Sequence, residues 1–206
     1  MTRYTTAKWV IATLAIIASV QGGWVHAKAL LAQHLLQQAW TRTVVSGHAQ
    51  KPWPWADTYA VLHLHVPRLD QDLIVLEGTS GEAMAFGPAR VTSGDSEGDT
   101  TQATVIGGHR DTHLQFLSQL ETGDDLVLNR ADGSSQRYQL TDTFIADVMT
   151  DQLQVDVHQD ALILITCYPF DALASGGRLR FIAIATPVAK PPLKLRAQRA
   201  RGVIRS

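Results

Sequence analysis

ALILITC, residues 161–167, is the stretch from which the rest of the chain can be organised. Six apolar or near-apolar residues precede the thiol, which predicts a buried strand ending at Cys167. The segment that follows, residues 168–183 (YPFDALASGGRLRFIA), predicts a Pro/Gly-containing loop and then a strand that carries arginine. Cys167 is the only cysteine in the sequence, so it has no disulfide partner within the chain.

A second apolar strand ends at a histidine in residues 104–113 (TVIGGHRDTH). A thiol with a pKa of about 8.5 is only a few per cent ionised at neutral pH, and a nearby cation raises that fraction. In the chemical hypothesis that follows, Cys167 attacks a carbonyl, His109 protonates a leaving amine and an arginine stabilises the oxyanion. The alternative is that Cys167 is a core residue and that His109 is structural.

The charge distribution excludes one class of partner. All 19 acidic residues lie between Asp57 and Asp171, whereas only seven of the 18 basic residues lie between Pro52 and Ala189, which gives that stretch a net charge of −12. Nucleic-acid backbones bind clustered Lys and Arg. We therefore expect no nucleic-acid partner for the central domain.

The N-terminal 26 residues predict a basic start followed by a membrane anchor. Residues 1–8 contain Arg3 and Lys8 and no acid, and residues 9–25 (WVIATLAIIASVQGGWV) are mostly apolar. A cleaved signal peptide is the rival, since Val25-His26-Ala27 resembles a cleavage site, and a buried soluble helix is a third possibility. Because the basic residues precede the span, we expect a single-pass anchor in the cytoplasmic membrane with the remainder of the chain exported.

Residues 27–54 predict a helical stalk and a linker. Residues 27–40 are strong helix formers, and KPWPW at 51–55 contains two prolines that stop a helix. The predicted catalytic domain then covers residues 55–187. The segment after this domain, residues 188–206, carries six basic residues and no acid, and we expect it to be disordered.

The central domain predicts a mainly β fold with short helices. Residues 59–66 (YAVLHLHV) alternate, and His63 and His65 fall on one face, where a solvated face is favoured over a metal pair. Seven or eight short strands indicate a closed barrel or a sandwich. Strands are predicted over 59–66, 73–76, 104–106, 125–129, 137–141, 143–148, 162–166 and 178–186, a short helix or turn over 80–86, helical spacing over 114–120 and a hairpin turn at 131–133.

Three segments resemble the sortases, a family of cysteine transpeptidases. Leu164-Ile165-Thr166-Cys167 is similar to the family motif Thr-Leu-x-Thr-Cys, with Ile163 in place of the first Thr. Residues 108–113 (GHRDTH), 85–88 (AFGP) and 166–173 (TCYPFDAL) closely resemble the class found in Gram-negative bacteria. The resemblance runs in order over about Tyr59 to Ala185.

The resemblance implies an eight-stranded sortase-type β-barrel behind an N-terminal membrane-anchor helix, with the catalytic domain on the periplasmic side. It implies an exported substrate protein with a C-terminal signal of the Leu-Pro-x-Thr-Gly kind. Cys167 would cleave the Thr-Gly bond to form a thioacyl enzyme, His109 would be the general acid and base, and an amine of unknown identity would accept the product. Sortases use no metal or organic cofactor for this chemistry.

The resemblance leaves the arginine to be chosen. Arg178 and Arg180 are two residues apart and would share a strand face; the long loop after the cysteine and the Arg-Phe-Ile-Ala run favour Arg180 as catalytic. Arg178, Thr166, Asp111 and His113 are expected to bind substrate or to support the site. Thr166 could equally be a plain strand residue, and Asp111 and His113 could only cap the next helix.

Two other functions fit parts of the sequence. An L,D-transpeptidase acting on peptidoglycan also uses Cys, His and Arg, but its Ser-x-Gly-Cys arrangement is absent because Ile165-Thr166 precedes Cys167. A non-catalytic, membrane-tethered β-barrel adaptor would keep Cys167 inert and buried.

Overall fold

The computed structural model describes residues 27–78, 80–91, 103–151, 159–172 and 176–188. The predicted anchor at 1–26, the polar loop at 93–101 and nearly all of the basic tail lie outside these ranges. Within them, no helix is both long and apolar enough to cross a membrane.

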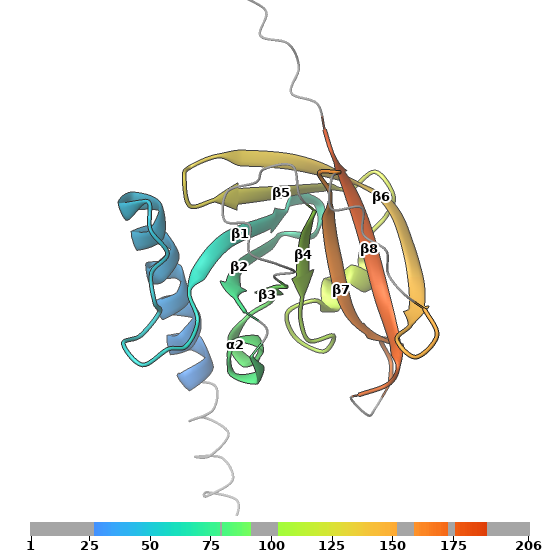
Figure 1. Ribbon diagram of the computed structural model, residues 1–206, viewed down its shortest axis with the longest axis horizontal. Coiled ribbons are helices and arrows are strands. Elements are labelled where there is room, and N and C mark those ends of the chain that lie inside the picture. The colour runs from blue at the N-terminus through green and yellow to red at the C-terminus, as the bar shows by residue number, and fades with distance from the viewer. Residues whose placement is uncertain (1–26, 79, 92–102, 152–158, 173–175, 189–206) are drawn as a thin grey trace, which may run out of the picture.

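The described strands close into one barrel in the order β1-β2-β3-β4-β7-β8-β6-β5 (Figure 1). This confirms the predicted mainly β fold with an eight-stranded closed barrel. Most neighbours are antiparallel, while β2 with β3 and β4 with β7 are parallel. The elements are β1 (Ala60–Val66), η1 (Pro67–Leu69), β2 (Gln71–Glu77), α2 (Gly81–Phe86), β3 (Ala89–Arg90), β4 (Thr104–Gly107), η2 (Gln115–Gln119), β5 (Asp125–Arg130), β6 (Ser135–Asp147), β7 (Leu162–Tyr168) and β8 (Leu179–Pro187).

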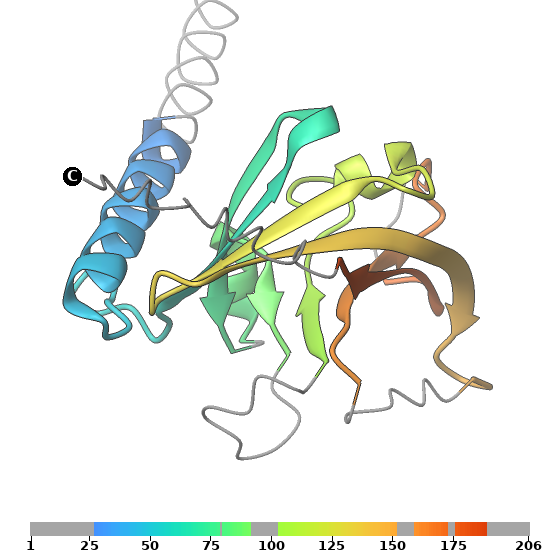
Figure 2. The same cartoon turned by 90° about the horizontal axis from the view of Figure 1, so that it is seen from above.

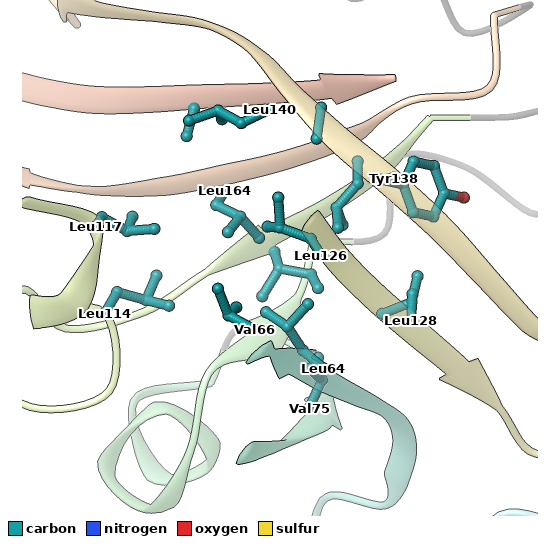
Figure 3. Packing of buried hydrophobic residues seen from close by; sticks show 14 of the residues in the cluster. Leu64, Val66, Val75, Leu114, Leu117, Leu126, Leu128, Tyr138, Leu140 and Leu164 are labelled. Carbon is teal, nitrogen blue, oxygen red and sulfur yellow. The ribbon is translucent and has the colours of Figure 1, made fainter. Parts of the chain in front are cut away.

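Alternating side chains fill the barrel. Successive residues of a strand point to opposite faces, so every second residue of β1, β5 and β7 enters the core. The interior cluster includes Leu64, Leu126 and Leu164, which Figure 3 shows meeting from three strands. Leu114 and Leu117, at η2, pack against the same cluster and cover one part of it.

A helix over residues 27–46 packs against the outside of the barrel (Figure 2). Leu36, Ala39 and Trp40 form a second apolar cluster with residues of β1 and β2. The Trp40 ring also lies 5.9 Å from the ring of His63. This helix therefore partly covers the face of β1 at His63, whose side chain is 17% exposed, so His63 is less solvated than the sequence predicts. The His63 side chain contacts Asp72, and its Nδ1 accepts a 3.0 Å hydrogen bond from Asn129 Nδ2.

Three element boundaries differ from the sequence expectation. The strands predicted at 137–141 and 143–148 are one strand, β6, with a register shift between Leu140 and Asp142. The two-residue β3 carries too little periodicity to predict. β8 begins at Leu179, so Arg178 lies before the strand and does not share it with Arg180. The predicted turn at 131–133 is confirmed, with a 3.1 Å bond from Gly133 N to Arg130 O.

A polar network centred on the buried Tyr138 lies at the end of the barrel where β7 begins. Tyr138 on β6 is fully buried, and Figure 3 shows its hydroxyl pointing away from the leucine cluster. The hydroxyl donates to Asp160 Oδ1 at 2.8 Å and accepts from Arg130 Nη2 at 3.3 Å. Burial, with the bond to Asp160, raises the pKa of Tyr138 to about 12. The phenol therefore stays neutral and bonded over the physiological range.

Candidate active site

Cys167 and Arg180 face each other at the opposite end of β7. They are directly paired residues of the antiparallel β7–β8 ladder. Directly paired residues point to the same face of a sheet, with Cβ atoms roughly 4.5–5.5 Å apart. Since Leu162 and Leu164 of β7 point into the barrel, Cys167 lies on the outer face, and it is partly exposed. The strand thus presents the thiol at the surface beside the guanidinium-bearing residue.

The Arg180 guanidinium is held at the end of the loop that precedes β8. Among the described residues, both of its hydrogen bonds use Nη1, which donates to Gly177 O at 2.6 Å and to Leu179 O at 2.9 Å. Nε and Nη2 therefore retain donors that can meet a substrate oxygen.

The parallel pairing of β4 and β7 brings His109 level with Cys167. Gly107, the last residue of β4, pairs with Ile165, so Cys167 lies two residues further along β7 and His109 lies two residues beyond the end of β4. The chain past β4 is held there by two bonds. Gly108 N donates to Ile165 O at 3.2 Å, and Thr166 Oγ1 donates to Gly108 O at 2.8 Å. Thr166 is 2% exposed and points inward, so its hydroxyl holds the start of the histidine loop.

Position 108 leaves little room for a side chain. A Cβ there would lie 3.0 and 3.1 Å from two carbon atoms of the Leu114 side chain and 3.4 Å from Pro88 Cα. Leu114 is fully buried in the core, so it has little room to move. The second glycine of the Gly-Gly turn therefore permits the close approach that puts His109 at the rim of the barrel.

His109 itself is exposed at this rim, and its neighbours are charged. Asp111 is 60% exposed on its side chain, and its bond with Arg110 lowers the pKa of the carboxyl, with His109 contributing in the same direction. His113 is half-buried; burial lowers its pKa, a bond to the backbone of Ala85 opposes this, and the nearby His109 lowers it further. Both residues thus lie within electrostatic reach of His109.

Arg178 is directed away from this group. Its Nε lies 2.9 Å from Asp147 Oδ2, and its side chain is 69% exposed. Of the two candidate arginines, only Arg180 is the direct cross-strand partner of Cys167.

Arg110 is the residue at this site that the sequence did not single out. It is 5% exposed, and its guanidinium bonds Asp111, Pro169 O and Ala172 O. The sequence signal is its place in the run after Gly108, in a domain with few basic residues, but its burial could not be inferred from that pattern.

The described residues give no indication of a metal centre. No group of three or more His, Cys, Asp and Glu side chains gathers in the parts of the chain that the structure describes.

Comparison with known proteins places this barrel in a family. The sortase domain model matches residues 64–188, which is more than half of the chain, and the chain belongs to the sortase family. It is 32% identical over 108 residues to sortase D of Bacillus subtilis (strain 168), over 52% of this chain and 54% of that protein. The chain thus aligns with about half the length of this relative.

Solved sortase structures share the fold. Sortase A from Corynebacterium diphtheriae superposes with a TM-score of 0.56 at 22% identity, covering 68% of this chain and 65% of that one. Sortase A of Listeria monocytogenes gives a TM-score of 0.53 at 22% identity, with coverage of 63% and 88%.

Proposed function

We propose that this sortase-family chain is a cysteine transpeptidase that cleaves a C-terminal sorting signal of the Leu-Pro-x-Thr-Gly kind between Thr and Gly. The observation that carries the proposal is the geometry at the end of β7. Cys167 pairs directly with Arg180, and the loop carrying His109 is fixed to the same strand by the Thr166–Gly108 bond.

These three side chains supply the nucleophile, the proton donor and the oxyanion donors that the proposed reaction needs. The Cys167 thiolate attacks the Thr carbonyl carbon, and the oxyanion that forms is stabilised by the Arg180 donors. The Thr–Gly C–N bond then breaks while His109 donates its proton to the departing amine. This leaves a thioester on Cys167. An incoming amine attacks the thioester, gives its proton to His109, and expels the thiolate as the new amide forms.

The sequence motifs support a finer assignment. Residues 108–113, 85–88 and 166–173 match the class of sortases found in Gram-negative bacteria, which supports a chain anchored in the cytoplasmic membrane with its domain in the periplasm. Leu30 and Leu31 support such an anchor, because they are 74% and 57% exposed near the start of the described helix, where membrane contact would cover them. Protease accessibility in spheroplasts tests this orientation: digestion of the domain from outside is expected, and protection would contradict it.

The test of the activity uses the full chain in mild detergent. It is incubated with a Leu-Pro-x-Thr-Gly peptide and with hydroxylamine as a small amine, and the products are identified by mass. The expected products are the peptide ending at Thr, as its hydroxamate, and the released Gly fragment, with neither formed by Cys167→Ala.

The alternatives give different results. A folded chain that leaves the peptide intact and whose Cys167 resists alkylation supports a non-catalytic adaptor. A folded chain that cleaves a peptidoglycan stem peptide and not the sorting peptide supports an L,D-transpeptidase-like activity.

A further inference from the structure

Two loops meet at the site, and one buried side chain joins them. The first loop follows β4 and carries His109; the second follows Cys167 and begins at Pro169. Arg110 belongs to the first loop. Its Nη1 donates to Pro169 O at 2.7 Å and its Nη2 donates to Ala172 O at 2.8 Å. The guanidinium therefore bonds two carbonyls of the second loop, five residues or fewer after the thiol.

The orientation of this guanidinium is itself fixed. Asp111 accepts from Nε at 2.6 Å and from Nη2 at 3.0 Å, so the planar group is gripped along one edge by its neighbour and along the other by the second loop. Bidentate pairing of this kind sets direction as well as attraction. With 5% exposure, the group has little room to turn.

The second loop is also anchored from its aromatic side. The Phe170 ring lies 5.1 Å from that of Phe181 on β8, and Phe170 packs against the barrel core. Phe170 thus holds this loop to β8, while Arg110 holds it to the histidine loop. These are separate contacts, and among the described residues of this loop it is the Arg110 contact that links it to the loop carrying His109.

We infer that Arg110 is a positioning residue that sets the distance and orientation of His109 relative to Cys167 by bonding the histidine loop to the carbonyls of Pro169 and Ala172. The inference rests on the proposed function only for the identity of the reacting pair. Arg110 acts through His109: the four hydrogen bonds of its guanidinium to described residues go to Asp111 and to the backbone oxygens of Pro169 and Ala172. The charge of Arg110 also lies near Cys167, since Cys167 contributes to the raised pKa of Arg110 after the larger effect of Asp111.

A conservative variant separates position from charge. Arg110→Lys keeps the cation near the thiol but loses the planar fork, and a single ammonium group cannot span Asp111 and both carbonyls in the same way. Arg68 offers a matched control. It has the same pattern, with Nε donating to Asp124 Oδ1 at 2.5 Å and Nη2 bonding Gln119 O, but its partners lie near η1 and η2. Arg68→Lys therefore reports the cost of losing a guanidinium fork away from the site.

The first readout is the pH profile of Cys167 alkylation by iodoacetamide in the full chain. The reagent is neutral and the chain has one cysteine, so the rate reports this thiol alone. A neighbouring imidazolium favours the thiolate, so His109→Ala is expected to slow alkylation at neutral pH and to move the profile toward higher pH. Arg110→Lys is expected to move the profile in the same direction by a smaller amount, and the Arg68→Lys profile is expected to match the wild type.

The second readout is steady-state cleavage of the sorting peptide. Misplacement of a reacting group by about 1 Å lowers the rate on the order of 100-fold. Arg110→Lys is therefore expected to lower kcat by roughly that factor, with KM changed by less than about threefold. Thermal melting of Arg110→Lys and Arg68→Lys shows whether both remain folded.

Asp111→Asn gives a second, milder variant in case Arg110→Lys does not fold. It removes the charge that orients the guanidinium, and it should move the alkylation profile in the same direction by a smaller amount, with Asp124→Asn as its control. An Arg110→Lys profile that coincides with the wild type, or a shift no larger than that of Arg68→Lys, would overturn the inference. Alkylation needs no substrate, so the two proposals can fail separately. If the alkylation profiles of the variants shift as expected but the peptide is not cleaved, the proposed substrate is contradicted and the positioning role is supported.

Discussion

The two ends of β7 both carry polar residues, but in different states. Where the strand begins, Tyr138 is buried and its hydroxyl bonds both Asp160 and Arg130. Where the strand ends, Cys167 and Arg180 are partly exposed and His109 is exposed. A polar group whose partners all come from the protein stabilises the fold, whereas one that keeps donors or a nucleophile at the surface can meet a substrate. We therefore propose that the end with Tyr138 stabilises the fold and that the end with Cys167 performs the chemistry.

The largest expected effect is at the end with Cys167. Cys167→Ala removes the nucleophile, and peptide cleavage should fall on the order of 10⁴-fold or more. The partly exposed thiol contributes little to packing, so the melting temperature should change by no more than about 2 °C. Cleavage at the wild-type rate by Cys167→Ala would show that another residue is the nucleophile.

The next effect distinguishes the two arginines. Arg180→Ala should lower kcat by roughly 10²–10³-fold, because it removes the donors that face the developing oxyanion. Arg178→Ala removes an exposed ion pair with Asp147 and should change kcat by less than about fivefold. Steady-state kinetics of both variants decide the matter, and a larger loss in Arg178→Ala would reverse the assignment.

At the end with Tyr138, the effect should fall on stability and not on rate. Tyr138→Phe leaves Asp160 without its 2.8 Å donor and should lower the free energy of unfolding by about 2 kcal/mol. Denaturant unfolding measures this loss. The specific activity of the folded protein should match the wild type, and a drop in kcat would show that the two ends are coupled.

The smallest effect is a pH dependence. Folding raises the pKa of Tyr138 from 10.0 to about 12, so the stabilisation is fully present below pH 10 and is lost as pH rises through the folded pKa. Between about pH 10 and about pH 11 the wild type should lose about 1 kcal/mol more than Tyr138→Phe. Parallel unfolding curves for the two proteins over this range would contradict the network at the end with Tyr138.

Local sequence patterns predicted most of the barrel. Alternation predicts the strand that contains Leu64 and an apolar run predicts the strand that contains Leu164, each to within about two residues, and the Asp-Gly turn at 132–133 predicts a hairpin. The contacts between distant segments could not be predicted from local sequence patterns. Nothing local indicates that Trp40 covers His63, or that β6 continues through its register shift at Leu140.

The same limit applies to the site. A cysteine at a strand end and a histidine after Gly-Gly are local patterns, and motif resemblance joined them. The preference for Arg180 over Arg178 rests on loop length and on the Arg-Phe-Ile-Ala run, whereas the structure adds a physical reason in the direct pairing with Cys167. The burial of Arg110 depends on carbonyls about 60 residues further along the chain, which no local pattern encodes.

The central claim is that Cys167, at the end of β7, forms the covalent bond with substrate. The most direct measurement is the intact mass of the full chain after brief reaction with a Leu-Pro-x-Thr-Gly peptide and acid quenching, followed by fragmentation to locate the adduct. The account predicts a mass gain equal to the peptide acyl group ending at Thr, located on Cys167 and absent from Cys167→Ala. An adduct on another residue, or cleavage with the same adduct in Cys167→Ala, would contradict it.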